Sequence, residues 1–215
     1  MILKDIKLVI FDLDGVLLDT ERISISCWIK AFEKYGYKLD FNIAAEEIGS
    51  STNNRESYYK SIMGNDLPFG EINDLYYNTL IDSIKSDKNL LKKGAIDILN
   101  YLDLNKVKKA VASSSRKDRV IESLKAANIL ERFDFILCGD DVNKCKPDPE
   151  IHIKICQHLG IDISDAIIIE DSDIGVEAAF NANIKCVLIP DLKRIPTEWL
   201  NKCYAVKENL FEVFM

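Results

Sequence analysis

Short apolar segments recur along the chain, once near its start and repeatedly in its second half, and polar residues follow each of them. Amphipathic stretches, with apolar residues at helical spacing, separate these segments. Strands that are apolar almost throughout and alternate with helices are typical of a parallel sheet covered on both faces. The pattern therefore predicts an α/β fold with a doubly wound, Rossmann-like parallel sheet, whose strands lie at residues 7–11, 109–112, 133–138, 166–169 and 185–189.

Residues 19–89, which separate the first predicted strand from the second, follow a different pattern. They are helical and polar in character, and the sequence offers no convincing strand there. The first helix begins at Thr20 and ends at Gly36, and its apolar positions are Ile23, Trp28, Ala31, Phe32 and Tyr35. Further helical segments are expected at 44–48, 55–63 and 71–84. We therefore expect an α/β core domain of residues 1–18 and 90–215, and a smaller all-α domain of residues 19–89.

The polar residues that follow the strands carry the candidate chemistry. Asp12 and Asp14 end the first strand one residue apart, so that their side chains begin on the same side. Later strand ends lead to serines 113–115, to Lys146-Pro147 and to Glu170-Asp171. Each segment alone has an ordinary explanation as a turn or a helix start. Their common position at the carboxyl edge of the sheet, where ligands of such folds bind, needs another explanation.

Four carboxylates at this edge would repel one another and lose hydration unless a cation or a reaction needs them. They belong to Asp12, Asp14, Glu170 and Asp171. Such a group suggests Mg²⁺, which prefers oxygen ligands and usually retains a substrate phosphate oxygen. A hydroxyl and an ammonium group opposite them suit a phosphoryl group, and the N–H groups of the helix after Ser113 add an anion site. With a carboxylate as nucleophile, the inferred reaction is phosphoryl transfer through an aspartyl phosphate.

The ordered set of motifs resembles the haloacid dehalogenase superfamily, and most nearly its β-phosphoglucomutase-like branch of phosphatases and mutases. The motifs are Asp12-x-Asp14-Gly15-Val16, Ser113, Lys146-Pro147 and Glu170-Asp171, and they span residues 8 to about 182. Any one of them is a weak signal, whereas the set in this order is specific. The helical insertion is similar to the cap domain of that branch.

This resemblance implies a role for each residue that handles the phosphoryl group. Asp12 resembles the nucleophile, and Asp14 the general acid/base that protonates the leaving oxygen and then activates water. Ser113 and Lys146 resemble the pair that holds the phosphate, with Ser114 beside them. Dehalogenases of the superfamily lack an acid at the position of Asp14, because a departing halide needs no proton, so dehalogenation is disfavoured.

The resemblance also implies a Mg²⁺ site. Asp171 resembles a ligand of the metal, together with Asp12 and the backbone carbonyl of Asp14. Glu170 is a ligand in some members of the superfamily and supports the ligands in others, so both possibilities stay open for this chain.

By the same resemblance, the all-α domain is a cap that closes over the substrate, excludes water and supplies specificity. Its expected contact points are Thr20, Glu21 and Ser24 at the start of the first helix, and the 49–55 loop. Arg55 either pairs with a second phosphate of the substrate or is a solvated helix residue.

The cap also bears on the choice between hydrolysis and isomerisation. Sugar-phosphate mutases of this branch have a histidine where this chain has Ser24, an arginine near Thr52, and a cap lysine that has no clear counterpart near Tyr76 and Tyr77. We therefore expect a Mg²⁺-dependent phosphatase of small phosphorylated metabolites, with sugar phosphates as the favoured class. The alternatives are a β-phosphoglucomutase-type mutase, a receiver-like phospho-acceptor domain and an inactive phosphate-binding regulator.

Composition indicates which partners and which cellular location are expected. The 215 residues carry a formal charge of −7 without a block of like charge, which argues against nucleic acid as a partner. No apolar run approaches the roughly 20 residues of a membrane helix, and charges interrupt the first residues before a signal peptide could form. Six cysteines without metal-ligand spacing suit a reducing compartment. We expect a cytoplasmic protein that does not bind membranes and is a monomer or a weak homo-oligomer.

Overall fold

The computed structural model describes residues 2–47 and 52–215, and the chain divides into two compact units. One unit comprises Met1–Asp19 and Asn89–Met215 and contains the sheet. The other comprises Thr20–Lys88 and is helical. We call them the α/β unit and the helical unit.

The α/β unit is built on a six-stranded sheet in which every neighbouring pair is parallel. The strands lie in the order β3-β2-β1-β4-β5-β6. Because the chain moves outward from β1 to β3 and then returns to the other side of β1, the direction of winding reverses between β1 and β4. The predicted doubly wound parallel sheet is therefore confirmed, with strands β1 (Leu8–Phe11), β2 (Lys108–Ser113), β3 (Phe135–Cys138), β4 (Ala166–Glu170), β5 (Lys185–Leu188) and β6 (Ala205–Val206).

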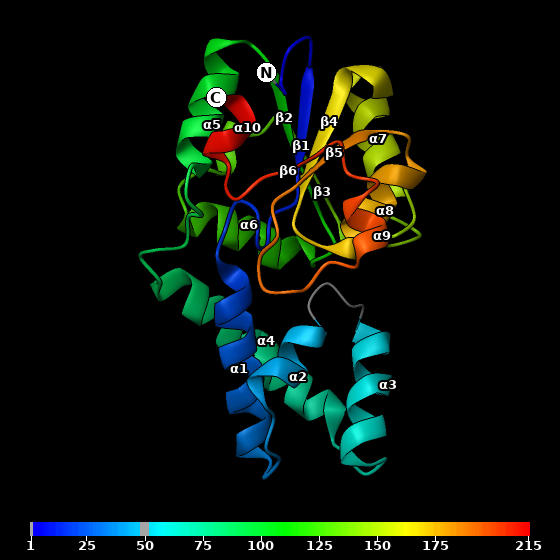
Figure 1. Ribbon diagram of the computed structural model, residues 1–215. Helices are drawn as coiled ribbons and strands as arrows, with labels where there is room; N and C mark the ends of the chain where they lie inside the picture. Colours follow the sequence, from blue (N-terminus) through cyan, green and yellow to red (C-terminus); the bar gives the residue numbers. More distant parts are fainter. Residues whose placement is uncertain (1, 48–51) are drawn as a thin grey trace. The chain divides into compact units, whose positions relative to one another are not determined.

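Helices cover both faces of this sheet (Figure 1). On one face lie α7 (Glu150–Leu159), α8 (Asp173–Asn181) and α9 (Thr197–Leu200), and on the other α5 (Ala95–Leu104), α6 (Lys117–Ala126) and α10 (Phe211–Phe214). Alternate residues of β1 face opposite layers, and Leu8 and Ile10 pack into the buried cluster formed with α7 and α8. Three single turns, η1 (Leu130–Arg132), η2 (Gly139–Asp141) and η3 (Ile163–Asp165), complete the connections.

The sequence pattern missed some elements of the α/β unit and placed the start of the third strand two residues too early. It gave no place to α5, α9, α10 or the two-residue strand β6. The third strand begins at Phe135, two residues later than expected, because the preceding Asp134 contacts the start of β2 with its side chain. Its carboxylate accepts a hydrogen bond from the backbone of Lys109 at 2.9 Å and pairs with Lys108 at 2.6 Å.

The helical unit consists of α1 (Thr20–Lys34), α2 (Phe41–Glu46), α3 (Thr52–Met63) and α4 (Phe69–Ser86). Its centre is aromatic. The ring of Trp28 stacks on Tyr76 with centroids 3.9 Å apart and on Phe69 at 5.9 Å. Tyr59 packs edge-on against Phe32 at 4.9 Å. Aromatic packing of this kind holds together helices whose other faces are polar.

The helix positions in this unit differ in detail from those expected. In α1 the predicted positions Trp28, Ala31 and Phe32 are buried, and the buried stripe also includes Ile25 and Cys27. Ile23 is half-buried, and Tyr35, which follows the helix, is 40% exposed. The stripe is shifted because Trp28 faces α4, which fixes the rotation of α1. The second helix begins at Phe41, three residues early, because the Asp40 carboxylate accepts from the Asn42 N–H at 2.8 Å.

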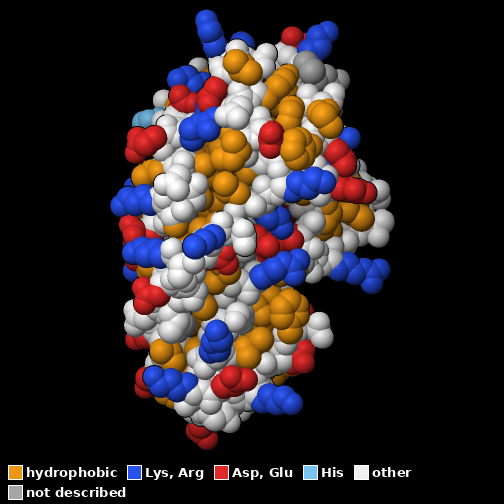
Figure 2. Space-filling model, turned by 90° about the vertical axis from the view of Figure 1, so that its left-hand side faces the viewer, with side chains coloured by type: hydrophobic (Ala, Val, Ile, Leu, Met, Phe, Trp, Pro, Cys, Tyr) orange, Lys and Arg blue, Asp and Glu red, His pale blue; other side chains and the backbone are white. Residues whose placement is uncertain are grey.

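Basic and acidic side chains are interspersed on the face of the molecule that Figure 2 shows, with no large area of one sign. Among the helices that the structure describes, none combines the length and the apolar character needed to cross a membrane.

Candidate active site

Asp12 stands at the point where β1 leaves the sheet. Its N–H still donates to the carbonyl of Ile169 at 2.9 Å, so the pairing with β4 extends one residue beyond the strand. The chain then turns within a few residues. Gly15 adopts a φ of 80°, which favours glycine, and its N–H donates to Leu18 O at 2.8 Å. This turn places Asp12 at the carboxyl edge of the sheet, with Asp14 two residues later, as the spacing predicted.

Lys146 is the centre of the site. Its Nζ donates to Asp12 Oδ1 at 2.6 Å, to Glu170 Oε1 at 2.6 Å and to the carbonyl oxygen of Ala112 at 2.9 Å. An ammonium group has three protons, so all three are in use. The acceptors lie level with one another on three neighbouring strands, because Phe11 is in register with both Val111 and Ile169.

Burial and neighbouring charges shift the pKa values of Asp12 and Lys146. Burial raises the pKa of Asp12 to about 7, the charges of Glu170 and Asp14 act in the same direction, and Lys146 opposes them. Burial alone would lower the pKa of Lys146, but the charges of Asp12 and Glu170 outweigh it and raise the pKa above its ordinary value. The lysine therefore remains an ammonium ion although its side chain is only 4% exposed.

Glu170 has both carboxylate oxygens engaged by the chain itself. Oε1 accepts from Lys146, while Oε2 accepts from the N–H groups of Asp171 at 3.0 Å and Ser172 at 3.2 Å, and from Ser172 Oγ at 3.0 Å. Gly175 of α8 lies against the same carboxylate, where a Cβ atom would overlap it. This side chain is thus fixed within the α/β unit and holds Lys146.

Ser113, the last residue of β2, and the two serines that follow it form the next part of the edge. Ser113 is buried, and its Oγ accepts from the Ser115 N–H at 3.1 Å. The N–H of Gly139 donates to Ser115 O at 3.0 Å, and a side chain at Gly139 would collide with the carbonyl of Ser114. The loop therefore lies tightly between β2 and the start of α6. Its proposed contacts with phosphate remain a prediction.

Asp14 has two partners that the sequence analysis did not identify. Arg119 of α6 donates from Nη2 to Asp14 Oδ1 at 2.7 Å, and Ser115 Oγ donates to Oδ2 at 3.0 Å. Nη1 of Arg119 also contacts Ser115 Oγ. Ser115 and Arg119 are four residues apart, the spacing of neighbours on a helix, which is the only signal in the sequence that links them.

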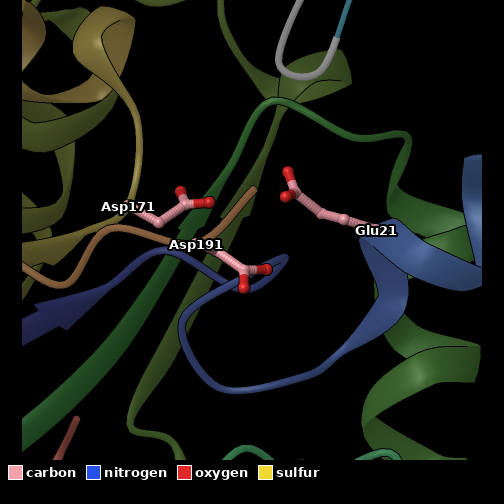
Figure 3. A group of neighbouring side chains, drawn as sticks. All are labelled: Glu21, Asp171 and Asp191. Atoms are coloured by element: carbon pink, nitrogen blue, oxygen red, sulfur yellow. The ribbon is translucent and has the colours of Figure 1, made fainter. Parts of the chain in front are cut away.

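Two further carboxylates meet beyond β4 and β5. Figure 3 labels Asp171 and Asp191, which follow these two strands, and also Glu21, the second residue of α1. One oxygen of Asp171 and one of Asp191 lie within 4.8 Å of each other. Asp191 Oδ1 accepts from Lys92 Nζ at 2.8 Å. Its Oδ2 is buried and has no hydrogen-bond partner among the residues that the structure describes.

Two of the predicted contact residues of the helical unit, Ser24 and Arg55, have partners within that unit. Thr20 is the first residue of α1, and Ser24 Oγ lies 2.8 Å from Tyr76 Oη. Arg55 lies on α3, not in a loop; its guanidinium stands over the Trp28 ring at 5.4 Å and donates to Glu47 O at 3.3 Å. Residues 49–51 of the expected 49–55 loop lie outside the described residues. Contact of these residues with substrate remains a prediction.

The two histidines belong to helix packing. His152 of α7 is buried, and burial lowers its pKa well below the usual value, so the ring stays neutral. The His158 ring stacks on Phe135 with centroids 3.8 Å apart. All six cysteines are free thiols.

Comparison with known proteins identifies the relatives of this chain. The family model described as haloacid dehalogenase-like hydrolase matches residues 9–189. The phosphorylated carbohydrates phosphatase of Thermotoga maritima is 30% identical over 193 residues, which cover 82% of each chain. The validoxylamine A 7'-phosphate phosphatase of Streptomyces hygroscopicus is 28% identical over 182 residues, which cover 84% of each chain.

A solved structure shows the same fold. The crystal structure of a β-phosphoglucomutase from Clostridium difficile matches with a TM-score of 0.82 at 24% identity, over 97% of this chain and 93% of that one. The fold, the order of the motifs along the chain and the family match over 9–189 agree with one another. The chain belongs to the family of haloacid dehalogenase-like hydrolases.

Proposed function

We propose that this chain is a Mg²⁺-dependent phosphatase that hydrolyses small phosphorylated metabolites through an aspartyl phosphate on Asp12. One observation carries the proposal: the buried Lys146 ammonium bridges Asp12 and Glu170 at 2.6 Å each, at the carboxyl edge of the sheet. This arrangement holds a carboxylate nucleophile in place beside a positive charge that an incoming phosphoryl group would meet. The phosphatase relatives support the same reaction class.

The residues at this edge fit Mg²⁺. The donors are all oxygen atoms, which this ion prefers. The Asp191 side chain is only 8% exposed and carries an oxygen that has no partner among the described residues, and one of its two oxygens lies within 4.8 Å of an oxygen of Asp171. Asp12, Asp171 and the backbone carbonyl of Asp14 would hold the ion. When bound, it would offset the negative charge of the phosphoryl oxygens. Glu170 would support these ligands through Lys146 instead of binding the ion, because its oxygens already accept from the chain.

The reaction follows from the positions of two carboxylates. Asp12 attacks phosphorus, and the bond between phosphorus and the leaving oxygen breaks while Asp14 gives that oxygen its proton. Asp14, now a carboxylate, takes a proton from a water molecule, whose oxygen attacks the phosphorus of the aspartyl phosphate. Inorganic phosphate leaves and Asp12 is regenerated. Ser113 would hold a phosphoryl oxygen in both steps, and the charge of Lys146, whose three protons are already engaged, would offset the negative charge of the phosphoryl group.

We further propose that the helical unit is the cap that selects the substrate. It is inserted between β1 and β2, directly after the turn that carries Asp14. Sugar phosphates are the favoured class, and the phosphorylated carbohydrates phosphatase among the relatives supports this. Thr20, Ser24 and Arg55 are the proposed contacts, and Ser24 and Arg55 would have to exchange their partners within the unit for a ligand. The six free thiols support a cytoplasmic, reducing location.

The test is a phosphate-release screen over sugar and nucleotide monophosphates, with and without Mg²⁺. Wild type should release phosphate only with the ion, and chelation should abolish the release. Asp12→Asn, which keeps the size of the side chain and removes the nucleophile, should be inactive. Equal release by wild type and Asp12→Asn would overturn the mechanism.

The same screen separates hydrolysis from isomerisation. A sugar bisphosphate is added to the sugar monophosphate substrates, and both free phosphate and isomerised sugar phosphate are measured. We expect free phosphate alone, because by the family resemblance this chain has Ser24 where the mutases of this branch have a histidine. Isomerisation that starts on addition of the bisphosphate would show instead that a second sugar, and not water, accepts the phosphoryl group.

A further inference from the structure

Two side chains of the α/β unit donate to the Asp14 carboxylate. Arg119 Nη2 donates to Oδ1 at 2.7 Å, and Ser115 Oγ donates to Oδ2 at 3.0 Å. The other terminal nitrogen of the guanidinium contacts Ser115 Oγ, which links the two donors to each other. The three side chains therefore form a ring in which each one touches the other two.

The ring constrains the side-chain torsions of Asp14. Its neighbours Leu13 and Val16 are each 1% exposed, and the turn that begins at Leu13 is closed by backbone hydrogen bonds. The backbone of Asp14 is thus anchored, and its side-chain torsions decide where the carboxyl group points. Donors to both oxygens select one orientation of that carboxyl group.

Arg119 acts from a rigid support. It occupies the third position of α6, whose residues Val120 and Leu124 are fully buried. The start of the helix is fixed again by Lys117, which donates from its backbone to Asp140 at 3.1 Å and from Nζ to Asp141 at 2.9 Å. A guanidinium on such a helix holds a fixed place, and its planar fork can contact a carboxylate and a hydroxyl together, which an ammonium group cannot do.

We propose that Arg119, together with Ser115, is a positioning residue that orients Asp14 for proton transfer to the leaving oxygen. The inference rests on the proposed function, in which Asp14 is the general acid. Arg119 touches neither the nucleophile nor the phosphoryl oxygens in this scheme, and it acts through Asp14 alone. Its loss should therefore impair only those reactions whose leaving group needs a proton.

Leaving groups of different basicity give the test. Glycerol 2-phosphate releases an alkoxide, which must be protonated, whereas acetyl phosphate releases acetate, which needs no proton. The value of kcat/KM reports the steps up to departure of the leaving group, so later attack by water does not enter it. We expect Arg119→Ala to lower kcat/KM for glycerol 2-phosphate at least about tenfold, given that misplacement by about 1 Å can cost 100-fold, and to leave acetyl phosphate within about threefold.

Further variants define the scale of the effect. Asp14→Asn has no acid at all and should show the full selective loss. Ser115→Ala should show a smaller loss of the same kind, and Arg119→Lys should recover only part of the activity on glycerol 2-phosphate. Lys125→Ala removes an exposed charge from the same helix and should match wild type on both substrates.

Each outcome decides a separate claim. Equal losses on both substrates in Arg119→Ala would show a structural or phosphate-binding role and overturn the inference, and so would unchanged or increased activity on glycerol 2-phosphate. If Asp14→Asn loses activity on glycerol 2-phosphate but not on acetyl phosphate, those results contradict only the role of Arg119 and leave the role of Asp14 intact. If Asp14→Asn loses both substrates equally, the proposed role of Asp14 is wrong and the inference fails with it.

Discussion

The contact between Gly175 and Glu170 gives a sharp test of how the site is held. Gly175 is the third residue of α8, and a Cβ atom at this position would overlap the carboxylate of Glu170. The overlap involves a fixed group, because that carboxylate accepts from Lys146, from two backbone N–H groups and from the Ser172 hydroxyl. Gly175→Ala must therefore displace Glu170 from its partners.

The expected cost follows from the interactions that would be lost. Breaking a buried ion pair costs about 3–5 kcal/mol, and replacing glycine by alanine within a helix returns at most about 1 kcal/mol. The net loss in the free energy of unfolding should be about 2–4 kcal/mol. Urea unfolding followed by circular dichroism measures it.

Gly70→Ala is the matched control. Gly70 is also a helical residue, in α4, and a Cβ atom there would meet no atom within 4 Å. The control should be neutral or stabilising by up to about 1 kcal/mol. In a Glu170→Ala background the overlap is gone, so Gly175→Ala should then cost less than about 1 kcal/mol. A free energy within about 0.5 kcal/mol of wild type for the single variant, or an equal cost in both backgrounds, would refute the reasoning.

Three other predictions concern single side chains. The buried His152 has its pKa lowered in the folded state, so the stability it contributes is complete above the unfolded value near 6.5 and declines below it. Between pH 6.5 and 5 wild type should lose about 2 kcal/mol more than His152→Leu in urea unfolding, and parallel pH profiles would contradict this. Lys146→Met leaves two buried carboxylates without their cation, so it should lower the free energy of unfolding by about 3–5 kcal/mol and abolish phosphate release. A stable, active variant would refute the central role of the lysine. Arg55→Ala removes the contact with Trp28 and should lower the free energy of unfolding by about 1 kcal/mol in urea unfolding, whereas no change would show that the contact contributes nothing.

The sequence alone predicted the sheet and most of the polar residues at its carboxyl edge, and the reason is geometric. Parallel strands end at one edge, so the residues after the predicted strand ends at 11, 112 and 169 had to meet once the strands were recognised. The same rule applies to Asp191, which follows the strand at 185–188. Asp191 belongs to none of the motifs, so it was not singled out. Lys146 lies in a loop, and it was singled out by its motif and not by its position in the fold.

Other features could not be derived from the pattern. The contact of Arg119 with Asp14 depends on where α6 begins and on the direction of a long side chain, neither of which the periodicity fixes. Two of the five apolar positions predicted for α1 are not buried, because a period of 3.6 residues allows two adjacent stripes. The stacking of Trp28 on Tyr76, between helices far apart in the sequence, decides between them.

The central claim is that Asp12 carries the phosphoryl group during turnover. Its most direct test is to mix the enzyme with Mg²⁺ and a substrate that it turns over, stop the reaction in acid within the first turnover, and locate the phosphoryl group by peptide mass spectrometry. The account predicts a phosphoryl group on Asp12 in wild type and none in Asp12→Asn. Release of phosphate by wild type with no phosphoryl group on Asp12, or with one on another residue, would contradict it.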